Sequence, residues 1–335
     1  MKQIKRMWRN LTQAQRRKII SVALVLLVVG AAWGMLQTGH SIQPLVEYFP
    51  FLEEIFPQEE PGVPASAPAE GTLLRVHILD VGQADCILVQ GPEKTMVIDG
   101  GEADDAETII GYLEKQGVEQ IDYYLNTHPH ADHYGGITRV MDAIPTREFF
   151  HHPVPEEITP TTRGYQKLIA YLAEHKDKTK TTVLDPGDTL DLGGGAVLTI
   201  LAPLEEYEDL NNNSLVGRLV FGETAFLFTG DAEKKSESAM LATGAELSAD
   251  VYSIPHHGSS TGMTKKFLEA VGPSWATISV GANNDYGHPH RETIQKLSDA
   301  NIPCLRTDLC GNIVFTTDGR ELTVEAEKGK YQKAA

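Results

Sequence analysis

Three histidines and one aspartate fall within six consecutive positions, residues 128–133, which read H-P-H-A-D-H. Histidine nitrogen and aspartate oxygen are common ligands of zinc and of its neighbours among the transition metals. The spacing divides naturally between two ions, with His128 and His130 on one ion and Asp132 and His133 on the other. We therefore predict a metal site in this segment.

The residues that flank this cluster favour a built site over the alternative, a surface loop that is merely rich in histidine. A strand-like stretch, residues 121–125, precedes the cluster, and a Gly-Gly pair follows it at 135–136. This order is typical of a strand, a tight loop and the start of a helix. Further polar clusters follow other predicted strands, at residues 99–101, 228–231, 255–259 and 286–289.

Two of these strand ends carry additional candidate ligands. Asp231 could bridge both ions because a carboxylate has two oxygens, and either His257 or His256 would complete the coordination of the second ion. Each motif alone is weak, since a turn aspartate is the commoner explanation of a Gly-Asp pair. Together with H-x-H-x-D-H, they indicate one constellation assembled from strand ends.

The elements that must position these residues alternate along the chain from about residue 73. Predicted strands lie at 75–89, 95–98, 121–125, near 183, and at 196–201, 215–221, 225–229, 251–254 and 275–280; predicted helices lie at 106–115, 137–143, 233–242, 265–270 and 291–300. No repeat of fixed period appears. This order suits a layered α/β domain with helices that cover both outer faces.

The N-terminal region has the composition of a membrane anchor. Residues 1–18 hold seven of the 29 Lys and Arg residues and no acid, so the remainder has 22 basic against 46 acidic residues, a net charge of −24. Residues 19–36 are uncharged and mostly aliphatic, close to the roughly 20 residues that a bilayer core requires. We predict one transmembrane helix there, with residues 1–18 in the cytoplasm and the bulk of the chain outside. A cleaved signal peptide and a secreted domain are the alternative.

Residues 37–70 contain six prolines interleaved with Glu and Ala, which favours an extended, semi-rigid linker. We predict that a single α/β domain takes residues 71–335. Outside the cell, Cys304 and Cys310 could pair across a turn, and two adjacent buried thiols are the alternative.

Seven stretches of the chain resemble the metallo-β-lactamase superfamily, in the branch formed by the extracytoplasmic domain of ComEC-type competence proteins. They lie at 79–85, 98–101, 128–136, 211–216, 228–231, 255–259 and 284–289. The resemblance implies a four-layered αββα sandwich, two divalent ions, zinc or manganese, at the edge of the two sheets, and hydrolysis by a hydroxide that these ions hold. ComEC-type proteins also have a multi-helix channel region, and one predicted span cannot form that pore.

The same resemblance implies roles for residues around the ions. Asp132 is expected to orient the attacking water as well as bind metal, with Asp231 as the bridging ligand. His288 is expected to hold a substrate phosphate or donate to the leaving group, or else to begin a helix. Asp99 is typical of a residue that orients a ligand histidine, and Asn213 and Ser259 are assigned to contacts around the ligands or the substrate.

Three neighbouring features are predicted to lie outside direct metal ligation. Many superfamily members have a further histidine where this chain has three asparagines, residues 211–213, which leaves the first ion with fewer nitrogen ligands and allows manganese to compete with zinc. Asp80 and Asp85 are predicted to brace the first turn. His151 and His152 are predicted to end a strand near the mouth of the cleft.

The predicted activity is metal-dependent hydrolysis of phosphodiesters, with DNA as the first substrate because of the ComEC resemblance. The net charge of −24 opposes it, since sequence-independent DNA binding requires Lys and Arg to neutralise phosphates. A phosphodiester of the cell envelope, such as teichoic acid bearing phosphorylcholine, is a second candidate substrate. A membrane-tethered DNA-uptake or binding protein with a vestigial metal site is a third possibility, and no protein partner is identifiable.

Overall fold

The computed structural model describes residues 68–69 and 71–328, which belong to one compact unit, residues 65–335. The predicted cytoplasmic segment, the membrane span and all but two residues of the predicted linker lie outside the described residues. Within the described part, no helix combines the length and the apolar character that crossing a membrane requires.

Fifteen strands form two mixed sheets in the described part of the chain. The first sheet has the order β15-β14-β1-β2-β3-β4-β5-β6, with β1 (Leu74–Ile78), β2 (Ile87–Gln90), β3 (Thr95–Ile98), β4 (Ile121–Leu125), β5 (Thr146–His151), β6 (Lys180–Val183), β14 (Ile313–Thr317) and β15 (Leu322–Ala326). The second has the order β13-β12-β11-β10-β9-β8-β7, with β7 (Thr189–Gly193), β8 (Ala196–Ala202), β9 (Val216–Phe221), β10 (Thr224–Phe228), β11 (Val251–Ser253), β12 (Trp275–Ile278) and β13 (Cys304–Arg306).

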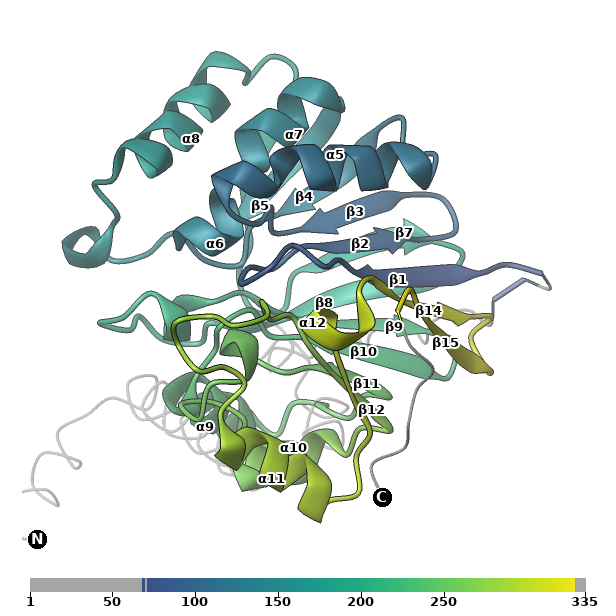
Figure 1. The fold of residues 1–335 in the computed structure, drawn as a ribbon. Helices are drawn as coiled ribbons and strands as arrows, with labels where there is room; N and C mark the ends of the chain where they lie inside the picture. The colour runs from purple at the N-terminus through teal and green to yellow at the C-terminus, as the bar shows by residue number, and fades with distance from the viewer. Residues whose placement is uncertain (1–67, 70, 329–335) are drawn as a thin grey trace, which may run out of the picture. The chain divides into compact units, whose positions relative to one another are not determined.

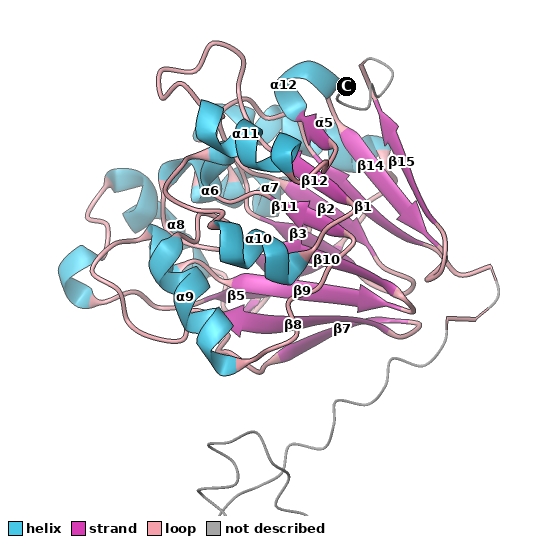
Figure 2. Ribbon diagram, turned by 90° about the horizontal axis from the view of Figure 1, so that it is seen from below, coloured by secondary structure: helices cyan, strands magenta, loops and turns pink. Residues whose placement is uncertain are grey.

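Helices cover the outer face of each sheet (Figures 1 and 2). Those over the first sheet are α5 (Ala106–Lys115), α7 (Ile137–Ala143) and α8 (Arg163–Glu174), with the short α6 (Ala131–Tyr134) beside them. Those over the second sheet are α9 (Lys234–Thr243), α10 (Lys265–Val271) and α11 (Arg291–Asp299). One further short helix, α12 (Thr307–Cys310), follows β13.

Three separate apolar clusters hold these layers together. The central cluster lies between the sheets and includes Val76 of β1 and Phe226 of β10. A second joins the first sheet to its helices through residues such as Ile109 and Leu113 of α5, and a third joins the second sheet to its helices through residues such as Phe267 of α10. Burial of apolar area on three interfaces requires four layers, so the predicted αββα sandwich is confirmed.

The boundaries of several elements differ from the prediction. Residues 75–89 form two strands rather than one, because the chain turns between β1 and β2, where Gly82 has a φ of +72°. α8 was not predicted, and only the end of β5, at His151, was. β5 begins with polar residues, and α8 buries only Leu168 and Leu172, which is a narrow apolar stripe.

The three cysteines of the described residues are free, so the pairing of Cys304 with Cys310 does not occur in this structure. Both side chains are half-buried thiols, Cys304 on β13 and Cys310 at the end of α12. The alternative of two neighbouring thiols therefore applies, and Cys86 is a third, buried one.

His77 of β1 predicts a loss of stability in mild acid. Its ring is buried, and Nδ1 lies 3.0 Å from the hydroxyl of Tyr112 on α5. Burial lowers the pKa of His77 from 6.5 to about 4. The unfolded chain therefore takes up a proton at this ring as the pH falls below 6.5, whereas the folded chain does so only near pH 4, and by pH 5 this difference should remove about 2 kcal/mol of stability.

Urea unfolding of the wild type and of His77→Gln at pH 7 and pH 5 measures this contribution. The glutamine does not titrate and can still contact the Tyr112 hydroxyl, so the variant should lose about 2 kcal/mol less than the wild type between the two pH values. The same pH dependence in both proteins would assign the acid sensitivity to other groups.

Candidate metal centre

The polar clusters converge because they follow parallel strands that end at the same edge. β3 and β4 are parallel neighbours in the first sheet, and β10, β11 and β12 are parallel neighbours in the second. Asp99 follows β3 and the 126–133 segment follows β4, while Asp231 follows β10. Gly230 allows the two loops to approach, since its φ is +47° and a Cβ there would lie 2.9 Å from the Thr127 side chain.

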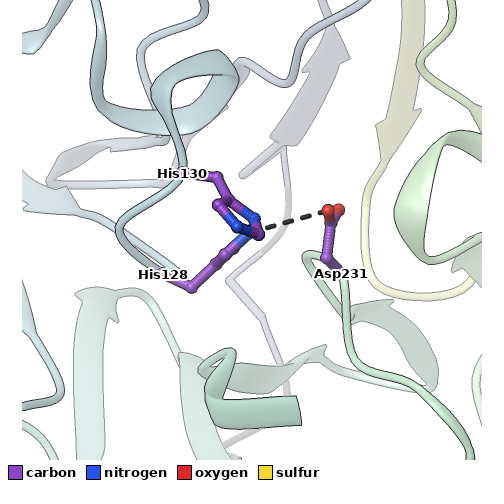
Figure 3. Close-up of side chains that lie close together, drawn as sticks. All are labelled: His128, His130 and Asp231. Carbon is purple, nitrogen blue, oxygen red and sulfur yellow. Dashed lines mark hydrogen bonds and ion pairs between the residues drawn. The ribbon is translucent and has the colours of Figure 1, made fainter. Parts of the chain in front are cut away.

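The first group of donors contains His128, His130 and Asp231 (Figure 3). One ligand atom from each of the three lies within 4.8 Å of the other two. The Nε2 atom of His128 is 3.6 Å from Oδ2 of Asp231 and 2.9 Å from Nδ1 of His130. Two imidazoles from the first sheet thus face a carboxylate from the second.

The second group contains Asp132, His133 and His257. Oδ2 of Asp132 lies 3.1 Å from Nε2 of His257 and 3.9 Å from Nε2 of His133. The same His133 nitrogen is 3.3 Å from Oδ1 of Asp231. Asp231 therefore presents one oxygen toward each group, as the sequence-based hypothesis of a bridging carboxylate requires.

The structure separates the roles of the two adjacent histidines. Nδ1 of His257 donates to the backbone carbonyl of Ser279 at 3.0 Å, which leaves Nε2 facing Asp132. His256 instead directs Nδ1 at the Glu233 carboxylate, 3.1 Å away, and its Nε2 is 3.8 Å from Asp231. Both residues have a left-handed backbone, with φ of 52° and 51°, which is uncommon for residues other than glycine and turns the two rings apart.

Asp99 is positioned to orient His133. Its Oδ2 lies 2.8 Å from Nδ1 of His133 and accepts from the Thr127 hydroxyl at 2.6 Å. Its Oδ1 accepts from the Thr127 backbone N–H at 2.7 Å and from the Asn126 amide at 2.9 Å. This buried carboxylate fixes which nitrogen of His133 carries a proton and leaves Nε2 facing the centre.

Replacement of Asp99 should therefore weaken metal binding without removing a donor. Asp99→Asn is expected to lower the affinity of the second group about 10- to 100-fold, because His133 loses the charged acceptor that orients it. Calorimetric titration of the metal-free protein with zinc measures the change. Asp122→Asn is the matched control, since Asp122 lies at the other end of β4 and accepts from the backbone N–H of Thr95 on β3. Equal affinities in all three proteins would contradict the orienting role.

In the centre, the imidazole rings of His133 and His257 form ion pairs with the carboxylates of Asp231 and Asp132. Burial and the charge of His133 hold the pKa of His128 well below its usual value. Burial opposes the charged form of His257, but the hydrogen bond to Asp132 raises its pKa to about 9. Burial likewise disfavours the Asp231 carboxylate, yet the charge of His133 and its hydrogen bond hold the pKa of Asp231 well below the usual range. A metal ion that binds these nitrogens would displace their protons.

Two buried atoms at the junction of the groups test whether a metal fits. Nε2 of His133 and Oδ1 of Asp231 are buried and have no hydrogen-bond partner among the described residues. Buried polar atoms are normally satisfied, and an unsatisfied pair at a shared position is typical of an ion site. Each group offers two imidazoles and one carboxylate, which is a donor set suited to zinc, manganese or iron. The residues present fit divalent metal ions.

The donors border a cleft of about 600 Å³. It is lined by residues of both groups and by Gln83, Glu102, Asp105, Tyr286 and His288. None of the described residues that line it is lysine or arginine. His288 belongs to this cleft, and the predicted alternative of a helix start does not apply, since α11 begins at Arg291 with His290 as its N-cap.

Two predicted residues lie outside this arrangement. The Asn213 amide donates to the carbonyls of Tyr207 and Asp209, so it closes a turn instead of facing the centre. The Ser259 hydroxyl accepts from Thr261 within its own loop. Short-range hydrogen bonds satisfy both side chains, as is usual for Asn and Ser in turns.

Sequence reasoning also missed two contributions. The Asp85 carboxylate, predicted only to brace a turn, forms a possible third donor group with His133 and Asp231, while its backbone does brace the turn by donating to the Asp132 carbonyl. The Ser214 hydroxyl accepts from the backbone N–H of Asp231 at 3.1 Å. The family-like stretches 79–85 and 211–216 contain these two residues, but neither stretch indicated the contact that its residue makes. His151 ends β5 as predicted, but His151 and His152 line a small separate pocket beside His128 and not the main cleft.

Comparisons with known proteins agree with this geometry. The family model of the metallo-beta-lactamase superfamily matches residues 79–281. ComE operon protein 3 of Bacillus subtilis (strain 168) is 26% identical over 269 residues, which are 73% of this chain and 33% of that protein. Competence protein ComA of Neisseria gonorrhoeae is 28% identical over 300 residues, which are 87% of this chain and 38% of that protein.

This chain therefore spans about a third of the length of these curated relatives. Among solved structures, the metallo-beta-lactamase fold protein YhfI from Bacillus subtilis has a TM-score of 0.47 and 14% identity, and the match covers 70% of this chain and 95% of that one. The family model covers more than half of the chain, and one of the two relatives is named as a competence protein. The chain belongs to the metallo-β-lactamase superfamily, in its ComEC-like branch.

Proposed function

We propose that this chain is a membrane-anchored, extracytoplasmic hydrolase that requires divalent metal ions and cleaves phosphodiester bonds in DNA. The observation that carries the proposal is the pair of donor groups joined at Asp231, whose two oxygens face opposite groups. A purely structural metal site does not require an open cleft with donors for two ions.

The side chains support this chemistry in different ways. His128, His130 and Asp231 would hold one ion, and Asp132, His133, His257 and Asp231 the other. Two such ions supply a nucleophile from water at neutral pH and stabilise charge on phosphoryl oxygens. The Asp132 carboxylate is the more exposed of the two aspartates, so it is suited to orient a water molecule in the cleft.

His288 is suited to contact the substrate phosphate as a neutral hydrogen-bond donor. Burial, together with the neighbouring charges of His256 and His257, lowers the pKa of His288 to about 4. The side-chain oxygen of Gln83, Oε1, accepts from the backbone N–H of Gly281 at 3.1 Å. The side-chain nitrogen of the same amide, Nε2, therefore faces Nδ1 of His288, at 3.4 Å. Nδ1 then accepts, and Nε2 carries the proton that a phosphate oxygen can receive as a hydrogen bond.

DNA is the favoured substrate because the sequence resembles ComEC-type competence proteins and one relative is named competence protein ComA. The predicted span at 19–36 and the basic residues before it support an anchor with the domain outside the cell. Zinc and manganese both suit the donor set. A cell-envelope phosphodiester and a non-catalytic binding role are the competing functions.

Incubation of the full-length chain in detergent with labelled single- and double-stranded DNA, and with choline-bearing teichoic acid, tests the proposal. Each substrate is assayed with zinc, with manganese and with EDTA. We expect DNA cleavage that EDTA abolishes and added metal restores. Cleavage of teichoic acid alone would favour the envelope function, and tightly bound metal without turnover of any substrate would favour a binding protein.

A further inference from the structure

Tyr286 is an exposed aromatic residue at the metal cleft. Large apolar side chains that are exposed in the described part of the chain are Leu73, Ile169, Val183, Tyr286 and Leu309, and Tyr286 is the aromatic one. Its exposed fraction is 69%, and it lines the same cleft as Asp132 and Asp231. Because Tyr286 lies beside the metal donors, its exposed ring can serve as a stacking contact for a substrate.

The ring of Tyr286 is stacked on His288, which connects it to the centre. The two ring centroids are 5.6 Å apart, with an angle of 22° between the planes. His288 in turn packs against the edge of His256 at 5.5 Å and lies nearly parallel to His257 at 6.4 Å. His288 covers one face of Tyr286, and the high exposure leaves the other face open to a ligand.

Asn284 holds the loop that carries this stack in place. Its Oδ1 accepts from the backbone N–H groups of Tyr286 at 3.2 Å and His288 at 2.9 Å. Its Nδ2 donates to the carbonyls of Gly281 at 2.9 Å and His288 at 2.7 Å. A ring that is already positioned loses little freedom when a ligand stacks on it.

The charge of the cleft determines which part of a nucleic acid this ring can bind. The cleft has no lysine or arginine among its described lining residues, and it contains Glu102 and Asp105. No lysine or arginine side chain of this lining therefore neutralises the phosphate backbone, whereas an aromatic face attracts a base regardless of charge because every base has a π-face.

We propose that Tyr286, backed by His288, is the residue on which a nucleobase next to the scissile phosphodiester stacks. The proposal rests on the proposed function and adds a substrate-positioning contact to it. A stacked base must be free of its partner strand, so the contact selects unpaired nucleotides. Stacking should also make the affinity for substrate nearly independent of salt concentration. Between 50 and 200 mM salt we expect KM to change less than about threefold, whereas the affinity of a protein with 6–10 phosphate contacts would fall about 10³- to 10⁵-fold.

Two substrates of equal length and charge test the contact, namely oligothymidylate and a strand of abasic units. The full-length wild type, Tyr286→Ala and Tyr286→Phe are compared by kcat/KM. The alanine variant should lose about tenfold or more on oligothymidylate, mainly through KM, and far less on the abasic strand, whereas phenylalanine should retain the wild-type ratio. Leu309→Ala, which removes an exposed apolar side chain that does not line the cleft, is the matched control.

Binding of the same two strands, followed by fluorescence anisotropy in EDTA, keeps the test independent of turnover. If the wild type cleaves neither strand, the proposed function fails, while weaker binding of oligothymidylate by Tyr286→Ala still supports the stacking contact. Equal losses on both strands, or no loss on oligothymidylate, would overturn it. If Tyr286→Ala loses activity only on choline-bearing phosphodiesters, assayed in the same way, the ring would instead contact a quaternary ammonium group.

Discussion

Replacement of Asp231 by asparagine should lower kcat/KM on any phosphodiester substrate by more than about 10³-fold, or ~4 kcal/mol of transition-state stabilisation. Asp231 is the residue whose oxygens face both donor groups, at 3.6 Å from His128 and 3.3 Å from His133. The amide has no charge and only one oxygen, so it cannot serve two cations. Metal analysis by mass spectrometry should show that both ions are lost or weakened.

The fold should survive this change, because asparagine keeps the size of the side chain and the backbone N–H of Asp231 still donates to Ser214. Circular dichroism and the melting temperature of the metal-free variant check this point. His130→Ala is the informative companion, since His130 belongs to the first group alone; it should also abolish turnover, with the second ion retained. Wild-type activity in either variant would refute the assignment of the centre.

The second large effect should distinguish His257 from its neighbour His256. His257→Ala is expected to reduce kcat/KM about 10³-fold, because it removes a donor whose Nε2 faces Asp132 at 3.1 Å. His256→Ala should reduce it no more than about tenfold, as expected for a side chain that contacts a ligand without being one. The two residues are adjacent, so each variant is the control for the other.

Metal content and steady-state rates of the two variants, measured in parallel, decide between them. His257→Ala should bind one ion fewer per chain, and His256→Ala should bind as many as the wild type. The reverse order would mean that His256 is the ligand and that the Glu233 contact of its Nδ1 orients it.

Much of the fold was predictable because the spacing of apolar residues distinguishes helices from strands, and turn residues mark where they end. β3, β4, α5 and α7 have the boundaries that the pattern predicts. The start of β5, all of α8 and the edge strand β15 were not predicted, because their burial comes from neighbours in space. In β15, half-buried residues alternate with exposed ones. Periodicity is a weak signal where one face of an element remains in water.

By itself, the sequence indicated the donor types and the division of the 128–133 segment between two groups, because all four donors lie within six consecutive residues. Only the tertiary structure decided which distant residues join them. In the structure, the Ser279 carbonyl at a neighbouring strand end orients His257 toward the donors, and Asp85 also lies among them. The side chains of Asn213 and Ser259 form hydrogen bonds within their own turns instead. These outcomes depend on backbone direction at loops and on contacts between two sheets, which no local pattern of residues records.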